Sequence, residues 1–463
     1  MRFLNLDGRL PRHLRVWPQF GRTRLTIPGR LALACAAVLV FRTVSTPATE
    51  GPAACRQDDF DAIAGLTLQQ KVDAFRTMSP KGSGTGRRDE QRMVCLILSI
   101  GPNDLSRFKF ELEYDGDYKD LVEYVFHDID DEDRQKTVLA HFRTAPRESR
   151  VKVLTDVDDT MVANLVDRRY AKGTLYPGVT AFYDALKQEP FATPQVPITT
   201  LSARPDPLVG VAEEASLRGI RALTGNRLSP SGQSGELKSS VIGTAETLAR
   251  GRNRSYLKQL SDRVPFKEED KIGKVKFANC QQFCAVFPEY QYVFVGDSGQ
   301  ADALTAQLLT NGILVEGMAR PITTFIHDLR ESSDDLHTVS PAFKRLSADD
   351  LVGDPPAARR GVIVFRNYIH AATIAYLQRE TLGHLIDATE LAAITSAALA
   401  DFERVAAMAP SRHLLEAQYK ADAERASRLV AAARSTSSAA MDLRRTLEAA
   451  HSEAVPRRSD RRR

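Results

Sequence analysis

Two aspartates, Asp156 and Asp158, follow directly after the short apolar stretch Val151–Thr155. Such a stretch is typical of a buried strand, and in open α/β sheets catalytic groups collect where parallel strands end. Two carboxylates at this spacing can face one centre, so that one attacks an electrophile while the other moves protons. That division of labour suits phosphoryl transfer through an acyl-phosphate. Because a carboxylate attacking an anionic phosphate needs its charge offset, we expect a hard cation such as Mg²⁺ with oxygen ligands.

Later polar residues could complete the same site. Ser202 follows the apolar residues 196–201, where its hydroxyl could donate to a phosphoryl oxygen. Lys276 begins a predicted helix, and its ammonium could neutralise both the nucleophile and the phosphate. Lys274 is a near rival for this role.

A third strand end supplies two more carboxylates. The apolar residues 292–295 are followed by Gly-Asp-Ser-Gly-Gln-Ala-Asp at 296–302, which places Asp297 and Asp302 just past a predicted strand. Carboxylates are the ligands that Mg²⁺ prefers in proteins, so we expect both to serve the metal.

The elements that position these residues alternate between short apolar stretches and helical stretches, which favours a parallel α/β sheet of Rossmann-like type. We assign this pattern to residues 149–330. The predicted strands are Val151–Thr155, 196–201, 292–295 and, less clearly, 313–316. The predicted helices are 182–187, 208–217 and 275–287.

Both flanks of this domain are predicted to be helical. Residues 56–148 show apolar residues at helical spacing, and the acidic segment 127–133 within them is interpreted as a helix start rather than a second catalytic block. Residues 331–360 are polar and form a predicted linker. Residues 361–463 are rich in Ala, Leu, Glu and Arg, and end in a basic tail.

Residues 1–55 are interpreted as a leader or a disordered segment. The first fifty residues hold eight arginines against Asp7 and Glu50, and their apolar stretch 31–41 is only eleven residues long. About 20 residues are needed to span a bilayer. A targeting leader of mitochondrial type and a disordered or misassigned start both stay open.

Composition and charge narrow the function classes. The chain has 463 residues, 43% of them hydrophobic, and a net charge of only +4, so nucleic acid is not expected as a partner. Five cysteines are an odd number, which argues against a disulfide framework and for a reducing compartment. Cys280 and Cys284 are interpreted as buried core thiols. We expect an intracellular protein, either cytoplasmic or peripheral to a membrane, with a possible organellar leader.

The blocks described above, in this order, resemble the haloacid dehalogenase (HAD) superfamily of phosphatases. Within it the likeness is closest to the catalytic domain of the actin-patch type of phosphatidate phosphatase. It rests on Asp-Val-Asp-Asp-Thr at 156–160, Tyr-Pro-Gly at 176–178, Leu-Ser-x-x-Pro at 201–205, and Phe-Pro at 287–288 leading to the block at 296–302. The resemblance covers about residues 150–330.

The resemblance implies a role for each residue of the site. Asp156 would attack phosphorus, and Asp158 would protonate the leaving oxygen and later activate water. Mg²⁺ would take the carboxylates of Asp156 and Asp297 and the backbone carbonyl of Asp158, with Asp302 supporting the metal or its waters. The phosphate-binding group would comprise Ser202 and Lys276, with Thr160 beside them stabilising the turn.

The expected reaction is hydrolysis of phosphatidate to diacylglycerol and phosphate. Only some fifteen residues separate Thr160 from Tyr176, which leaves no room there for a large cap domain, and an open site suits a bulky or membrane-embedded substrate. The basic residues 250–258 could contact an anionic membrane, or form a solvated loop. Two alternatives remain: a phosphatase of soluble phosphoesters or phosphoproteins, and a non-catalytic scaffold whose helical flanks bind partners.

Overall fold

The computed structural model describes residues 55, 62–78, 86–113, 121–148, 151–187, 198–202, 239–242, 271–310, 322–331, 340–344, 351–352, 361–382 and 385–435. Residues 51–463 form one compact unit. Several predicted segments lie outside the described residues: the leader before residue 55, the helix 208–217, the basic residues 250–258, the strand 313–316 and the basic tail.

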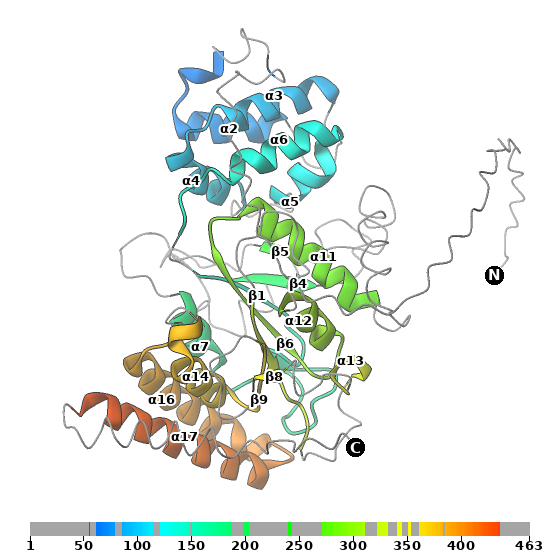
Figure 1. The fold of residues 1–463 in the computed structure, drawn as a ribbon. Helices are drawn as coiled ribbons and strands as arrows, with labels where there is room; N and C mark the ends of the chain where they lie inside the picture. Colours follow the sequence, from blue (N-terminus) through cyan, green and yellow to red (C-terminus); the bar gives the residue numbers. More distant parts are fainter. Residues whose placement is uncertain are drawn as a thin grey trace, which may run out of the picture. The chain divides into compact units, whose positions relative to one another are not determined.

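A seven-stranded parallel sheet is the framework of this unit (Figure 1). Its strand order is β5-β4-β1-β6-β7-β9-β8. The strands are β1 (Val151–Thr155), β4 (Thr199–Ser202), β5 (Ser239–Ile242), β6 (Gln291–Asp297), β7 (Thr323–His327), β8 (Leu351–Val352) and β9 (Val362–Phe365). The predicted α/β class with a parallel, Rossmann-like sheet is thereby confirmed.

Strand β1 lies between β4 and β6, so the chain leaves β1 toward one side of the sheet and later returns to its other side. In register, Thr155 at the end of β1 lies opposite Thr200 of β4 and Val295 of β6. The carboxyl ends of all three strands therefore meet. This is the switch point at which open α/β sheets bind ligands.

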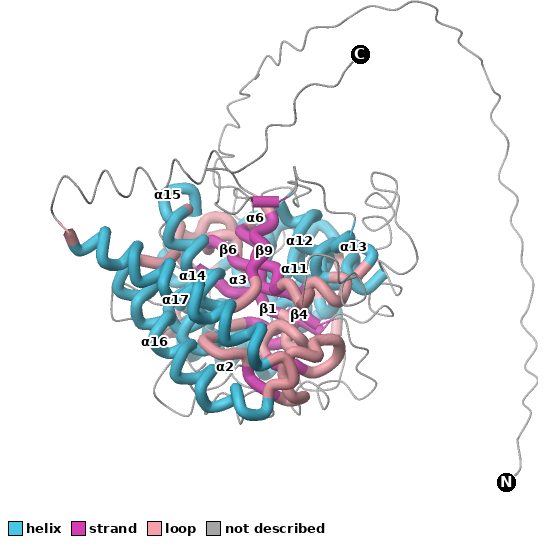
Figure 2. The backbone as a smooth tube through the Cα atoms, turned by 90° about the horizontal axis from the view of Figure 1, so that it is seen from below, coloured by secondary structure: helices cyan, strands magenta, loops and turns pink. Residues whose placement is uncertain are grey.

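Side chains alternate between two hydrophobic cores, one on each face of the sheet, because successive residues of a strand point to opposite faces. Leu154 and Phe294 belong to the first core, whereas Val153 and Val293 belong to the second. Helices α11 (Lys271–Val286) and α12 (Asp302–Thr310) cover the first face. The second face is covered by α7 (Val179–Lys187), α14 (Tyr368–Leu377), α16 (Ala388–Val405) and α17 (Arg412–Arg434). Figure 2 shows α14, α16 and α17 on one side of the strands and α11 and α12 on the other.

The sheet continues past residue 330, which the sequence predicts as the end of the domain. β9 pairs with β7, and β8, inside the predicted linker 331–360, pairs with β9. The pattern hides this extension because β9 has only four residues and is followed at once by α14, which is apolar on nearly all sides and buried along most of its length. Residues 361–463 are thus not purely helical, and their helices belong to the core of the sheet.

The turn at Tyr176-Pro-Gly178 shows how closely the C-terminal helix α16 packs against the catalytic domain. Gly178 has a φ of +84°, and a Cβ placed there would lie 2.6 Å from the Cβ of Ala398 on α16. Its backbone N–H donates to the carboxylate of Asp401, also on α16, at 3.0 Å. Glycine is therefore required at this turn by both backbone conformation and space.

The described part of residues 56–148 is helical, as predicted. It comprises α2 (Leu68–Met78), α3 (Arg87–Leu98), α4 (Pro102–Glu113), α5 (Leu121–Glu123), the π-helical turn η1 (Tyr124–Asp128) and α6 (Glu132–Phe142). The carboxylate of Asp131 caps α6 by accepting from the N–H groups of Asp133 and Arg134, so the acidic segment is a helix start. Among the described residues, no helix combines the length and the apolar character needed to cross a membrane.

A buried ion pair links these helices to the sheet domain. The ammonium of Lys109 on α4 lies 2.6 Å from a carboxylate oxygen of Glu289 and 3.0 Å from the carbonyl oxygen of Val286, at the end of α11. Both charged side chains are fully buried. Removing one partner of such a pair leaves the other charge buried and uncompensated, so loss of either side chain alone would be strongly destabilising.

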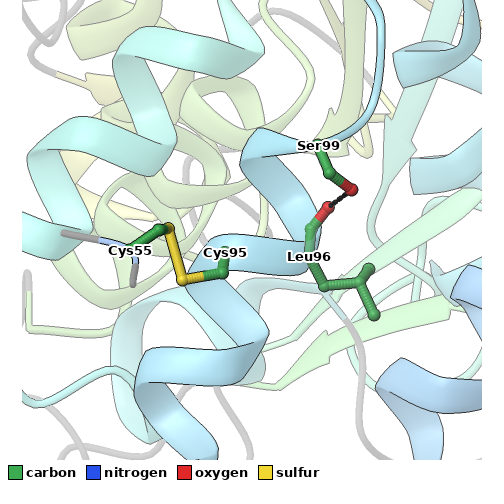
Figure 3. Close-up of a disulfide and its surroundings, with 4 residues drawn as sticks. All are labelled: Cys55, Cys95, Leu96 and Ser99. Carbon is green, nitrogen blue, oxygen red and sulfur yellow. Dashed lines mark hydrogen bonds between the residues drawn. A yellow bond between two sulfur atoms is a disulfide. The ribbon is translucent and has the colours of Figure 1, made fainter. Parts of the chain in front are cut away.

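The expectation that the cysteines remain reduced is wrong for one pair. Cys55 and Cys95 form a disulfide, which ties the segment before α2 to the middle of α3 (Figure 3). An odd cysteine count does not exclude a single bridge, so the argument for a reducing compartment fails. Cys280 and Cys284 are buried and free, with sulfur atoms 3.9 Å apart, which confirms their prediction as core thiols.

Reducing the Cys55–Cys95 disulfide is expected to destabilise the protein, because the bridge closes a loop of 40 residues in the unfolded chain. The chain-entropy model gives about 4 kcal/mol for a loop of this length. Denaturant unfolding with and without dithiothreitol measures the difference. The Cys55→Ser variant should have the same free energy of unfolding as the reduced wild type, and dithiothreitol should not change that value. Failure to find a Cys55–Cys95 linked peptide by non-reducing mass spectrometry would contradict the bridge.

Candidate active site and metal centre

Asp156 lies at the switch point of the sheet because it is the first residue after β1. Its backbone N–H donates to the carbonyl oxygen of Val295 at 2.9 Å, which extends the pairing of β1 with β6 by one residue. The side chain is largely buried. The ladder therefore places the carboxylate of Asp156 beside the end of β6.

Asp297 is the last residue of β6, and Asp302 is the first residue of α12. One carboxylate oxygen of Asp297 accepts from the N–H groups of Gly299 and Gln300, at 2.7 and 3.0 Å, which closes the turn between strand and helix. Asp302 folds back and accepts from the N–H of Asp297 at 3.3 Å. A Cβ on Gly296 would lie 2.6 Å from the Cβ of Asp302, so this close return requires glycine.

Lys276 reaches the site from α11. Its ammonium lies 2.8 Å from Oδ1 of Asp156 and 2.5 Å from Oδ1 of Asp302, and the side chain is buried. Although burial lowers it, the two carboxylates raise the pKa of Lys276 above its usual value. The lysine therefore stays charged near neutral pH and links the two aspartates.

The site holds more negative charge than Lys276 can neutralise. Asp156, Asp297 and Asp302 each offer an oxygen within 4.8 Å of the others, so with Lys276 the ionised groups carry a net charge of −2. Burial and the two neighbouring aspartates raise the pKa of Asp297 well above its usual range. Burial raises the pKa of Asp302 to about 6, against the opposing effect of Lys276. A divalent cation would supply the missing positive charge.

The oxygens that a cation would use are also present. Oδ2 of Asp156 and Oδ2 of Asp297 are buried, and neither accepts a hydrogen bond from the residues that the structure describes. Buried polar atoms without partners are uncommon, because each loses its hydration without compensation. Both oxygens of Asp302 are already hydrogen-bonded, so it fits a supporting role. This donor set suits a hard cation of the Mg²⁺ type, with water filling the remaining positions.

Asp158 lies two residues beyond Asp156, outside the cluster of three carboxylates. Its Oδ1 accepts a hydrogen bond of 2.7 Å from the side-chain amide of Asn164. One oxygen of this carboxylate thus contacts the flap, and the carboxylate is not part of the cluster. That separation suits an acid–base group better than a carboxylate ligand, and the metal role of its backbone carbonyl stays a prediction.

A small flap follows these residues. It is the antiparallel hairpin of β2 (Val162–Ala163) and β3 (Thr174–Leu175). Asp159, just before it, adopts a positive φ of 56°, which aspartate tolerates better than most residues. This reversal turns the chain away from the sheet and lets the flap begin immediately after Asp158.

For two residues of the predicted phosphate site, Ser202 and Thr160, the structure gives the backbone position but no contact that shows a role toward phosphate. Ser202 is the last residue of β4, the neighbour of β1, so its backbone lies at the correct edge of the sheet. Its role toward phosphate stays a prediction. The hydroxyl of Thr160 is buried without a hydrogen bond among the described residues, whereas its carbonyl oxygen accepts from Tyr368 at 2.7 Å. Thr160 therefore holds the turn through its backbone.

Sequence reasoning did not single out Asn164, Asp159 or His327, although all three support the turn that carries Asp158. Asp159 is part of the Asp-Val-Asp-Asp-Thr block, and its adjacency to Asp158 was the only available signal. His327 lies 168 residues from its partner Asp159, so no local spacing indicates the contact.

Replacing Asp297 by asparagine should stabilise the chelated protein and remove its response to Mg²⁺. Because the pKa of Asp297 is raised by folding, the wild type loses stability as pH rises above the usual value of 3.8. The variant should lose less, because only the raised pKa of Asp302 still contributes. Asparagine keeps the oxygen that accepts from Gly299 and Gln300.

Saturating Mg²⁺, at about 100 times its Kd, should stabilise the wild type by about 2.7 kcal/mol and the variant far less. Thermal unfolding in EDTA and in Mg²⁺ at pH 5 and 8 measures both effects.

The exposed Asp133→Asn change is the matched control for this experiment and should behave as the wild type. An equal Mg²⁺ response in Asp297→Asn and in the wild type would contradict a metal site at Asp297.

Comparison with known proteins gives no functional assignment, so any functional proposal rests on the geometry of the site. No protein-family model, no curated protein sequence and no solved structure matches the chain.

Proposed function

We propose that this protein is a Mg²⁺-dependent phosphatase of HAD type that works through a phosphorylated Asp156. The observation that carries the proposal is the buried cluster of Asp156, Asp297 and Asp302 around Lys276. Each of the first two has one oxygen that accepts no hydrogen bond from the described part of the chain. A divalent cation bound there would offset the negative charge of the carboxylates and of the phosphate. A purely structural cluster of this kind would keep its buried charges paired, which is the argument against the scaffold alternative.

The reaction divides between Asp156 and Asp158. An oxygen of Asp156 forms a bond to phosphorus while the bond between phosphorus and the ester oxygen breaks, and Asp158 gives its proton to the departing oxygen. Water then attacks the acyl-phosphate, with Asp158 taking its proton, which releases phosphate and restores Asp156. Lys276 stabilises the charge on the transferring group because it already contacts Asp156.

Phosphatidate is the proposed substrate, and the surroundings of the site support an amphiphilic phosphoester. The flap is a short hairpin, so no domain is inserted between β2 and β3. Leu165 on the flap and Ile272, one turn before Lys276 on α11, are each 49% exposed, although large apolar side chains are usually buried. Leu165 follows Asn164, the partner of Asp158, and Ile272 precedes Lys276 by one helical turn, so we propose that both meet acyl chains.

The decisive test of the mechanism compares the wild type with Asp156→Asn. Purified protein should release phosphate from phosphatidate in mixed micelles only when Mg²⁺ is present, and loss of the nucleophile should lower kcat on the order of 10³-fold or more. The Asp133→Asn variant should retain full activity. Equal activity in wild type and Asp156→Asn would remove the mechanism, and inactivity of the wild type on every phosphoester would favour the scaffold.

Substrate choice is tested with Leu165→Ser and Ile272→Ser. We expect each variant to hydrolyse micellar phosphatidate several-fold more slowly, because each loses apolar contact worth about 1–3 kcal/mol at most. Hydrolysis of soluble glycerol 3-phosphate should not change. A wild type that prefers glycerol 3-phosphate, or variants that slow both substrates equally, would favour the soluble phosphoester alternative.

A further inference from the structure

Asp158 has two tasks in the proposed reaction, and both depend on the direction in which its carboxylate points. A free aspartate rotates about its side-chain bonds, and catalytic acids lose efficiency when they are misplaced by about 1 Å. In the structure, one oxygen of Asp158 is held by the side-chain amide of Asn164, at 2.7 Å. Asn164 therefore limits this rotation.

Asn164 is itself fixed by the buried carboxylate of Asp159. That carboxylate accepts from the backbone N–H of Asn164 at 2.8 Å, from Leu165 at 3.1 Å and from Val166 at 2.6 Å. A weaker contact of 3.4 Å reaches the N–H of Asp167. One side chain thus anchors the first residues of the flap loop, and with them the amide that holds Asp158.

His327, the last residue of β7, contacts the backbone of Asp159. Its Nδ1 lies 3.1 Å from the carbonyl oxygen of Asp159, and its Nε2 lies 3.3 Å from the guanidinium of Arg169. Burial, together with the positive charge of Arg169, lowers the pKa of His327 to about 4, so the ring is neutral near neutral pH.

The hydrogen-bond partners assign the tautomer of this ring. Because Arg169 can only donate, Nε2 of His327 accepts and Nδ1 donates its proton to the carbonyl of Asp159. The opposite tautomer would satisfy only the carbonyl oxygen of Arg366, which lies 3.3 Å from Nε2.

A second buried carboxylate, that of Asp167, holds the other end of the flap loop. The carboxylate of Asp167 accepts from the guanidinium of Arg169 at 2.9 and 3.0 Å and from the hydroxyl of Tyr176 at 2.8 Å. Tyr176 also packs edge-on against His327, with ring centroids 4.5 Å apart. The flap loop is therefore held at both of its ends, and His327 touches both.

We propose that Asn164 is a positioning residue for Asp158, and that the hydrogen bond from His327 to Asp159 holds the flap on which Asn164 depends. The proposal rests on the phosphatase function argued above. The side chain of Asn164 has no described hydrogen bond to Asp156, Asp297 or Asp302. The backbone of His327 lies opposite Asp297 in the pairing of β6 with β7, but its ring contacts Asp159 and Arg169. Changes confined to these two side chains should therefore act on proton transfer rather than on metal or phosphate binding.

The nature of the leaving group separates this role from a general structural one. The alkoxide of an alkyl phosphate needs a proton as it departs, whereas 4-nitrophenolate is stable without one. The value of kcat/KM reports only the steps through the first phosphoryl transfer. A misplaced Asp158 should therefore lower kcat/KM for alkyl phosphates and leave 4-nitrophenyl phosphate nearly unchanged.

The first test uses Asn164→Ala. We expect kcat/KM for an alkyl phosphate to fall about 10- to 100-fold, part of the 10²- to 10⁴-fold that a general acid contributes, and that for 4-nitrophenyl phosphate to fall less than about 3-fold. Lys172→Ala, an exposed change on the same flap, should alter neither value. A wild type inactive on both substrates removes the phosphatase function itself. An active wild type with equal losses for both substrates in Asn164→Ala overturns only the positioning role.

The second test compares His327→Asn with His327→Gln. The amide nitrogen of asparagine can take the place of Nδ1 and donate to Asp159, whereas that of glutamine corresponds to Nε2. His327→Asn should keep most of the alkyl-phosphate activity, and His327→Gln should show the selective loss seen in Asn164→Ala.

Hydrogen–deuterium exchange gives a readout that does not depend on turnover. In His327→Gln, exchange of the amides of 164–167 should increase at least about 10-fold, since their acceptor Asp159 is no longer held. Exchange in α11 should stay at the wild-type level, which shows that the variant is folded. Unchanged exchange at 164–167 would overturn the supporting role of His327.

Discussion

The position of the Lys276 ammonium between Asp156 and Asp302 is the contact on which the rest of the site depends. Three carboxylates this close together would repel one another in a buried setting, and a single lysine makes their approach possible. It does not complete the charge balance. The pKa of Asp297 is raised, and oxygens of Asp156 and Asp297 remain without hydrogen bonds among the described residues, so the cluster is organised for an additional positive charge.

The sheet brings these groups together through its topology rather than through any long-range side-chain contact. Because β1 lies between β4 and β6, residues far apart in the sequence reach one edge of the sheet at neighbouring positions. The parallel ladders set the register, and the return of Asp302 over Gly296 then brings a second carboxylate to the same place. The turn after Asp156 supplies the remaining group, Asp158, whose carboxylate the flap contacts through Asn164.

Local patterns in the sequence were sufficient to find the ends of β1, β4 and β6 to within about two residues, and most of the charged residues of the site. They did not find β5, β7, β8 or β9. β1 was predicted with its observed bounds, and Asp156, Lys276, Asp297 and Asp302 do converge, because strand ends and helix starts are encoded within a few residues. Contacts between distant segments were not predictable in this way.

Three contacts join segments that are far apart in the sequence: the Cys55–Cys95 bridge, the hydrogen bond from His327 to Asp159 and the pairing of β9 with β7. The sequence of one segment does not indicate which other segment it contacts. The side chain of Asn164 is a related case: an asparagine beside a turn is ordinarily a turn residue, and only the fold shows that it reaches Asp158.

The C-terminal helices have a consequence for any attempt to isolate the catalytic unit. α14, α16 and α17, together with α7, cover one face of the sheet, and the hydroxyl of Tyr368 donates to the carbonyl oxygen of Thr160 within the nucleophile turn. A chain shortened after residue 330 would expose the apolar side chains of Val153, Val293 and Phe325 and leave β7 as an open edge. Uncovered apolar faces and unpaired edges promote aggregation, so the smallest independently folding piece that retains chemistry should extend through α17.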